Sequence, residues 1–162
     1  MDSKAEKILS KGLKEGYAGK SRHVSTKRGP FTLKATEITF PDGSLYNDHW
    51  IFKRTGGGQE IAQSGNDMAT RVFAGGVVNE EKLISLGIKE QDVVEYLKKV
   101  LPTVANKTRL HENIKPELDG EWQYEYIILK QYPEILLSIG VETIKYKNET
   151  VFVHAFLNTP IK

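Results

Sequence analysis

The sequence contains no cysteine among its 162 residues. It therefore has no disulfide framework, no thiolate ligand for a metal and no cysteine nucleophile. A chain without cysteine suits a reducing compartment, so we expect a cytoplasmic protein. No apolar run approaches the ~18 residues of a membrane-spanning helix, and residues 1–14 are too charged for a secretory signal. We accordingly expect a soluble chain with no membrane partner.

The chain also has no strong excess of one charge, since its formal net charge is +2. Residues 1–34, however, carry a net +6 and the remainder a net −4. The basic end is centred on Lys20, Arg22, Lys27 and Arg28, and one interpretation is a patch for phosphate or nucleic acid. The other is a solvated helix face followed by a basic loop. With no recognition helix and no interleaved aromatic residues, nucleic acid is the less favoured partner.

Recognisable catalytic and metal-binding motifs are missing as well. The four histidines, His23, His49, His111 and His154, show neither an i, i+4 nor a His-x-His spacing. We therefore assign no catalytic residue, no metal ligand and no cofactor from the sequence.

A helical period opens the chain. Apolar residues recur every three or four positions at Ala5, Ile8, Leu9 and Leu13. This spacing predicts a helix over residues 3–16 with one apolar stripe, which would pack on a sheet. Ser3 with Glu6 forms a capping box in sequence, and Gly16 supplies the stop. Residues 19–30, rich in glycine and polar residues, are expected to form an exposed loop.

Residues 31–76 have the alternation of a β meander. The predicted strands lie near residues 31–40, 45–53, 60–63 and 68–73. The stretch Thr55-Gly56-Gly57-Gly58 is interpreted as the hairpin turn after the second of them.

The period becomes helical again over residues 79–101, which we expect to form a helical linker ended by Pro102. Residues 102–118 are polar and long for a connection, which is typical of a lid or binding loop. Residues 119–158 then form a second β unit, with a tight turn at Lys147-Asn148-Glu149.

The second unit echoes the first. Trp122-Gln123-Tyr124 parallels Trp50-Ile51-Phe52, and Gly140-Val141-Glu142 parallels Gly58-Gln59-Glu60. Phe156 and Phe73 close the last strands in the same way. The conserved order of these landmarks favours an internal duplication.

The element order predicts a single α+β domain over residues 1–162. It would contain two similar antiparallel β units, with an N-terminal helix and a central helix packed on the sheet. If the two units pack about a pseudo-twofold axis, Trp50 and Trp122 would approach one another at the seam. That seam would be the natural place for a pocket.

The candidate ligand-binding residues are Trp50, Glu60, Trp122, Glu142 and Tyr124. Glu60 and Glu142 could face each other as paired carboxylates, one with a raised pKa acting as an acid. The alternative is that each of the two glutamates has the same structural role in its own unit, as a hydrogen-bond acceptor. The favoured hypothesis is a non-enzymatic domain that binds a small molecule or a protein partner. The alternatives are a small hydrolase or isomerase using Glu60 or Glu142, and a nucleic-acid accessory protein using the basic end. The sequence leaves the oligomeric state open.

Several short motifs are similar to those of a bacterial domain family of unknown function. They are Tyr17-Ala18-Gly19, Gly58-Gln59-Glu60 after Trp50, Gly75-Gly76, and residues 142–148 followed by Val151-Phe152. The chain resembles this family over residues 5–157. The first unit departs from the family's pattern at Gln63-Ser64-Gly65, where the family has Tyr-Lys. Some relatives join the domain to a helix-turn-helix regulator. The resemblance therefore implies a stand-alone sensing or binding module and supplies no catalytic residues.

Overall fold

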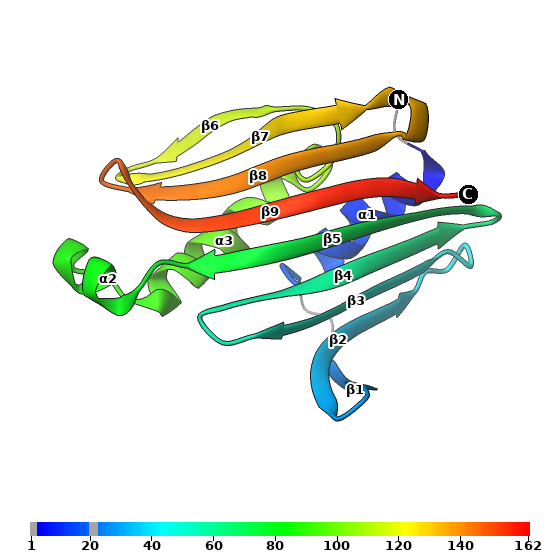
Figure 1. Cartoon of the computed structure of the whole chain (residues 1–162), viewed down its shortest axis with the longest axis horizontal. Helices are drawn as coiled ribbons and strands as arrows, with labels where there is room; N and C mark the ends of the chain where they lie inside the picture. The colour runs from blue at the N-terminus through cyan, green and yellow to red at the C-terminus, as the bar shows by residue number, and fades with distance from the viewer. Residues whose placement is uncertain (1–2, 20–22) are drawn as a thin grey trace.

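The computed structural model describes residues 3–19 and 23–162, and its strands form one nine-stranded antiparallel sheet (Figure 1). The elements are α1 (Lys4–Glu15), β1 (Val24–Arg28), β2 (Phe31–Thr39), β3 (Leu45–Phe52), β4 (Thr55–Ser64), β5 (Asp67–Val77), α2 (Glu80–Leu86), α3 (Glu90–Val104), β6 (Ile114–Asp119), β7 (Trp122–Tyr132), η1 (Pro133–Ile135), β8 (Leu137–Tyr146) and β9 (Glu149–Ile161). The strand order is β1-β2-β3-β4-β5-β9-β8-β7-β6. The expected α+β class with an antiparallel sheet is confirmed.

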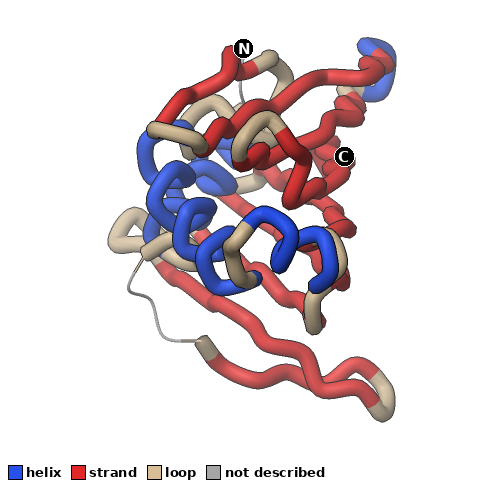
Figure 2. The backbone as a smooth tube through the Cα atoms, turned by 90° about the vertical axis from the view of Figure 1, so that its left-hand side faces the viewer, coloured by secondary structure: helices blue, strands red, loops and turns tan. Residues whose placement is uncertain are grey.

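Helices α1 and α3 cover one face of the sheet, which we call the inner face, and leave the other as the outer face (Figure 2). Helix α1 begins where the sequence predicts, because the Ser3 hydroxyl accepts from the Glu6 amide and Glu6 accepts from the Ser3 amide. Its apolar stripe packs on β3, β4 and β5. A Cβ on Gly12 would lie 2.2 Å from the ring of Tyr46, so the helix can sit this close only because position 12 has no side chain.

Helix α3 supplies the other half of the inner layer. Its buried residues are Val93, Tyr96, Leu97, Val100, Leu101 and Val104. They join the aromatic side chains of β5, β7 and β9 in the main hydrophobic core. Burial of this amphipathic face, rather than intrinsic propensity, holds α3 on the sheet.

The centre of the sheet is the antiparallel pair β5–β9, in which Phe73 lies opposite Phe156. Because the last strands of the two halves pair here, the first strands of each half lie toward the edges. No helix within the described residues is long and apolar enough to cross a membrane.

Three local predictions are wrong. Helix α3 continues through Pro102 to Val104, so Pro102 lies inside its last turn instead of ending it. Edge strands β1 and β6 occupy parts of the expected loops 19–30 and 102–118. Gly56 to Gly58 lie within β4, and the chain reverses at Lys53 and Arg54. Glycine is required at position 58 because a Cβ there would lie 2.7 Å from the Phe73 ring.

Candidate functional site

A row of buried polar side chains crosses the inner face of the sheet. The row runs through Asp48, Glu60, Arg71, Asn158 and Ser138, each opposite the next on β3, β4, β5, β9 and β8. All five are at most 5% exposed. Buried polar groups are costly unless they are hydrogen-bonded, so the partners of each one decide its role.

Both carboxylate oxygens of Glu60 accept hydrogen bonds from neighbouring side chains. Arg71 donates to it twice, from Nε at 2.5 Å and from Nη2 at 2.7 Å, and the Tyr46 hydroxyl donates at 2.7 Å. Burial alone would raise the pKa of the Glu60 carboxyl, but the charge and hydrogen bonds of Arg71 outweigh it, so this pKa is lowered. Glu60 is therefore an ionised structural group.

Glu142 has a matching set of partners. Arg109 donates from Nε at 2.9 Å and from Nη2 at 2.8 Å, and the Tyr124 hydroxyl donates at 2.6 Å. Burial again opposes ionisation, and Arg109 again outweighs it, so the pKa of Glu142 is lowered. Arg71 Nη1 donates to the Arg109 carbonyl at 3.2 Å, which joins the two pairs.

Each predicted carboxylate thus faces an arginine and a tyrosine and does not form a carboxylate pair with the other. Neither Glu60 nor Glu142 holds a proton that it could donate near neutral pH, and both lie at most 1% exposed. This geometry favours the structural interpretation of the two residues over acid and base work.

A cavity of about 140 Å³ lies on the inner face beside the polar row. Its aromatic walls are Tyr17, Trp50, Phe52, Phe73 and Phe152. Its polar lining within the protein is Asp48, Arg109 and His154, and the exposed residues Lys53, Arg54 and Glu90 complete it toward solvent. A small cavity with aromatic walls and a few polar groups is typical of a ligand site.

Within residues 3–19 and 23–162, Asp48 and His154 are the residues of this lining with buried side-chain polar atoms that make no hydrogen bond. Asp48 Oδ1 and both ring nitrogens of His154 have no hydrogen-bond partner in the described part of the chain. Burial, with a further contribution from Glu60, raises the pKa of Asp48 well above its usual range. Burial lowers the pKa of His154 to about 4, so its ring is neutral at physiological pH. Both groups are therefore available to a ligand.

The two predicted tryptophans lie in different places. Trp50 borders the cavity and packs edge-on against Tyr17 at 6.3 Å between ring centroids. Trp122 packs against Tyr96 at 4.9 Å and Tyr146 at 4.7 Å. Strands β4, β5, β9 and β8 separate β3 from β7, so the expected approach of Trp50 and Trp122 at a seam is wrong. Of the other predicted site residues, Tyr124 meets Glu142, and Glu60 is linked to them through the two arginines.

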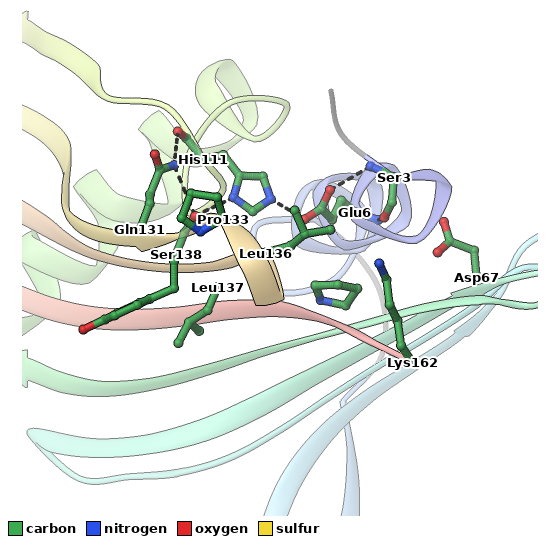
Figure 3. Close-up of a pocket in the computed structure, with 12 residues that line it drawn as sticks. Ser3, Glu6, Asp67, His111, Gln131, Pro133, Leu136, Leu137, Ser138 and Lys162 are labelled. Carbon is green, nitrogen blue, oxygen red and sulfur yellow. Dashed lines mark hydrogen bonds and ion pairs between the residues drawn. The ribbon is translucent and has the colours of Figure 1, made fainter.

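A second hollow, an open cleft of about 470 Å³, lies where α1 meets the ends of β8 and β9 (Figure 3). His111 bridges two side chains there, with Nδ1 2.5 Å from Ser138 Oγ and Nε2 bonded to Glu6 Oε1. Gln131 Nε2 also donates to Ser138 Oγ, at 3.3 Å, and to the His111 carbonyl, at 3.0 Å. The order carboxylate, imidazole, hydroxyl is that of a nucleophilic triad.

The Ser138 hydroxyl is nevertheless a poor nucleophile here. The residue is only 2% exposed, and the amide donor beside its oxygen, Gln131, already donates to a backbone carbonyl. Glu6 Oε2 accepts from the Ser3 amide and so belongs to the cap of α1. We therefore interpret His111 as a bridge that ties the start of α1 to β8.

Replacing His111 with alanine is expected to lower the free energy of unfolding by about 1–2 kcal/mol, because the hydrogen bonds to Ser138 and Glu6 are both lost. The matched control is Glu112→Ala, which changes the exposed neighbour. Urea unfolding of both variants measures the difference. Equal stability of the two variants would show that the His111 bridge does not contribute to the free energy of unfolding.

Asp48, Arg71, Arg109 and His154 were not among the site residues predicted from the sequence. The signal was present for Arg71 and Asp48, because each is a charge in phase with apolar neighbours on the inward side of a strand. Arg109 gave no such signal, because it lies between elements in the left-handed region, at φ 62°.

The basic end and the possibility of a metal site remain to be placed in the structure. Lys20 and Arg22 lie outside the described residues, while Lys27 and Arg28 lie on edge strand β1. Among residues 3–19 and 23–162, no cluster of three acidic, histidine or cysteine side chains could hold a metal ion.

Comparison of the chain with protein-family models, with curated proteins and with solved structures gave no match.

Proposed function

We propose that this chain is a small-molecule-binding domain whose site is the inner cavity beside Asp48 and His154. The observation that carries the proposal is the free hydrogen-bonding capacity of two polar side chains that are more than nine-tenths buried and border an aromatic-walled cavity. A native fold keeps such groups unpaired at a cost in stability, and sites of function are where that cost is tolerated.

Thermal unfolding against a broad panel of metabolites and nucleotides tests the proposal, because a ligand that binds only the folded state raises Tm. The variant is Val94→Phe, which enlarges a side chain that lines the cavity. The control is Val153→Phe, the same change on the outer face, where Val153 is 39% exposed. We expect a Tm rise in the wild type and in the control that is lost in Val94→Phe.

A rise that survives in Val94→Phe would place the ligand elsewhere. The absence of any rise across the panel would favour the other partner class, a protein. The outer face would be its docking surface, because no helix in the described part of the chain covers it and it exposes apolar residues. Val72, Ile127, Leu129, Val153 and Leu157 are between 39% and 62% exposed.

We also propose that the two β units are copies of one another. The support is their register: Gly58 lies opposite Phe73 and Gly140 opposite Phe156, and each glycine precedes its glutamate by two residues. Related sequences that keep the glycine and glutamate in both units would strengthen this proposal, and independent variation of the two units would weaken it.

A further inference from the structure

We propose that the ligand of the inner cavity is a small organic cation, a protonated amine on a single ring, with Asp48 as its anionic partner. This inference rests on the proposed function and assigns the chemical class of the ligand.

The buried acidic and basic side chains around the cavity are not equal in number. Three carboxyl groups, those of Asp48, Glu60 and Glu142, lie there with two guanidinium groups. The buried Glu6 of α1 lies farther along the row and is bonded to Ser3 and His111. Arg71 and Arg109 are each bound through two nitrogens to a glutamate. Asp48 makes no ion pair with any described residue, so the cluster contains one carboxyl without a cation.

Arg71 and Arg109 act on Asp48 without forming an ion pair with it, and its position lets a cavity ligand supply a cation in direct contact. Its side chain lines the cavity, the residue is 5% exposed, and Oδ1 has no hydrogen-bond partner among the described residues. An isolated carboxylate in such a place is strongly disfavoured, whereas a carboxylate bonded to a buried ammonium group is not.

The aromatic walls of the cavity favour the same sign of charge, and the one buried cation among the described residues of the lining, Arg109, is bound through two nitrogens to a glutamate. Aromatic faces are electron-rich, so they attract cations and repel anions. Trp50, the best of the side chains for this contact, borders the cavity together with Phe52 and Phe73. The neutral ring of His154 can in addition accept one hydrogen bond through an unprotonated nitrogen.

The size of the cavity limits the ligand to a single ring. A cavity of about 140 Å³ is close to the ~150 Å³ of an apolar cavity that holds benzene. Nucleotides and polyamines with several charges are too large to be enclosed. Lys53 and Arg54 are exposed at the edge, where solvent and salt screen their repulsion.

Three matched probes test the inference: benzylamine, benzyl alcohol and benzoate, which share a ring and differ in charge. The chain has two tryptophans, so its amide and indole NMR spectrum contains two indole N–H signals. The Trp50 signal reports on the cavity, and the Trp122 signal is an internal control on another part of the inner face. For a probe this small we expect a Kd of about 1 mM.

In the wild type at pH 7, benzylamine is expected to shift the Trp50 signal with a Kd at least tenfold lower than that of benzyl alcohol. Benzoate should leave the signal unmoved. Asp48→Asn should lose the tenfold preference for the amine and still admit benzyl alcohol, while Asp119→Asn, at an exposed position, should behave as the wild type.

Equal or tighter binding of benzyl alcohol or benzoate by the wild type would overturn the amine assignment and leave the proposed binding function intact. The same holds if Asp48→Asn retains the preference. Because the probe comparison is made on the unaltered chain, it decides the question even if a variant does not fold. Failure of all three probes overturns the inference, and the metabolite panel then decides separately whether the cavity binds anything.

Discussion

Replacing Arg71 with alanine is expected to lower the free energy of unfolding by about 3–5 kcal/mol. The substitution leaves the Glu60 carboxylate buried without its cation, and the Arg109 carbonyl without its donor. For a chain of this length the loss corresponds to a fall in Tm of roughly 6–20 °C. Differential scanning calorimetry measures it directly.

Two controls separate the burial of a charge from the loss of a contact. Lys99→Ala removes an exposed ion pair with Asp119 and should change stability by no more than about 0.5 kcal/mol. The double variant Glu60→Leu/Arg71→Met removes both charges, so it should be more stable than Arg71→Ala alone. A double variant less stable than the single one would show that the pair itself, and not the unpaired charge, determines the cost.

Replacing Asp48 with asparagine is expected to raise the free energy of unfolding by about 2 kcal/mol at pH 8. At that pH the folded wild type must hold either an unpaired buried carboxylate or a proton that the unfolded chain has released, and asparagine avoids both. The pKa of Asp48 is raised in the folded state, whereas an unfolded aspartate has a pKa of about 3.9. In the wild type, the stability associated with the protonated carboxyl is complete below the unfolded pKa. It is lost as the pH rises through the folded pKa.

The stabilisation by Asp48→Asn should therefore be close to zero near pH 4 and should grow as the pH rises. Urea unfolding of both proteins at several pH values measures the difference in the free energy of unfolding. Both proteins should also lose stability as the pH falls toward the lowered pKa values of Glu60 and Glu142, and this loss is common to the two. A variant less stable than the wild type at pH 8 would mean that Asp48 is already satisfied in the free protein. If Asp48→Asn is more stable than the wild type but no longer prefers benzylamine, the wild type gives up stability at this position in order to bind, as expected at a binding site.

The elements with one buried and one open side could be predicted from the sequence. Helix α1 and its cap match the 3–16 prediction within one residue, and the Lys147-Asn148 turn joins β8 to β9 with both residues at positive φ. Edge strands β1 and β6 could not, because almost every residue in them is exposed and no alternation of polarity marks them.

The site depended on long-range pairing that no local pattern contains. Trp50 and Trp122 were expected to meet because each opens its unit, but pairing of β5 with β9 places the closing residues Phe73 and Phe156 at the centre. The sequence singles out Glu60 and Glu142 as candidate ligand-binding residues, whereas in the structure each is bound to an arginine and neither lines the inner cavity. Their arginine partners were not predicted. Arg109 is 33 residues from Glu142, and only the folded chain brings them together.

The pKa of Asp48, measured in the free protein and with benzylamine, is the sharpest test of Asp48 as the anionic partner of a bound amine. It can be followed by the carbon-13 shift of its carboxyl group during a pH titration. The charged and titratable groups that act on Asp48 are Glu60, Arg71 and Arg109, with Tyr17 and Tyr46 also close enough to interact with it. We expect a pKa well above the usual aspartate range in the free protein. Saturating benzylamine should lower this pKa, because the ammonium group stabilises the carboxylate. A pKa in the usual range, or one that benzylamine leaves unchanged, would contradict this role of Asp48.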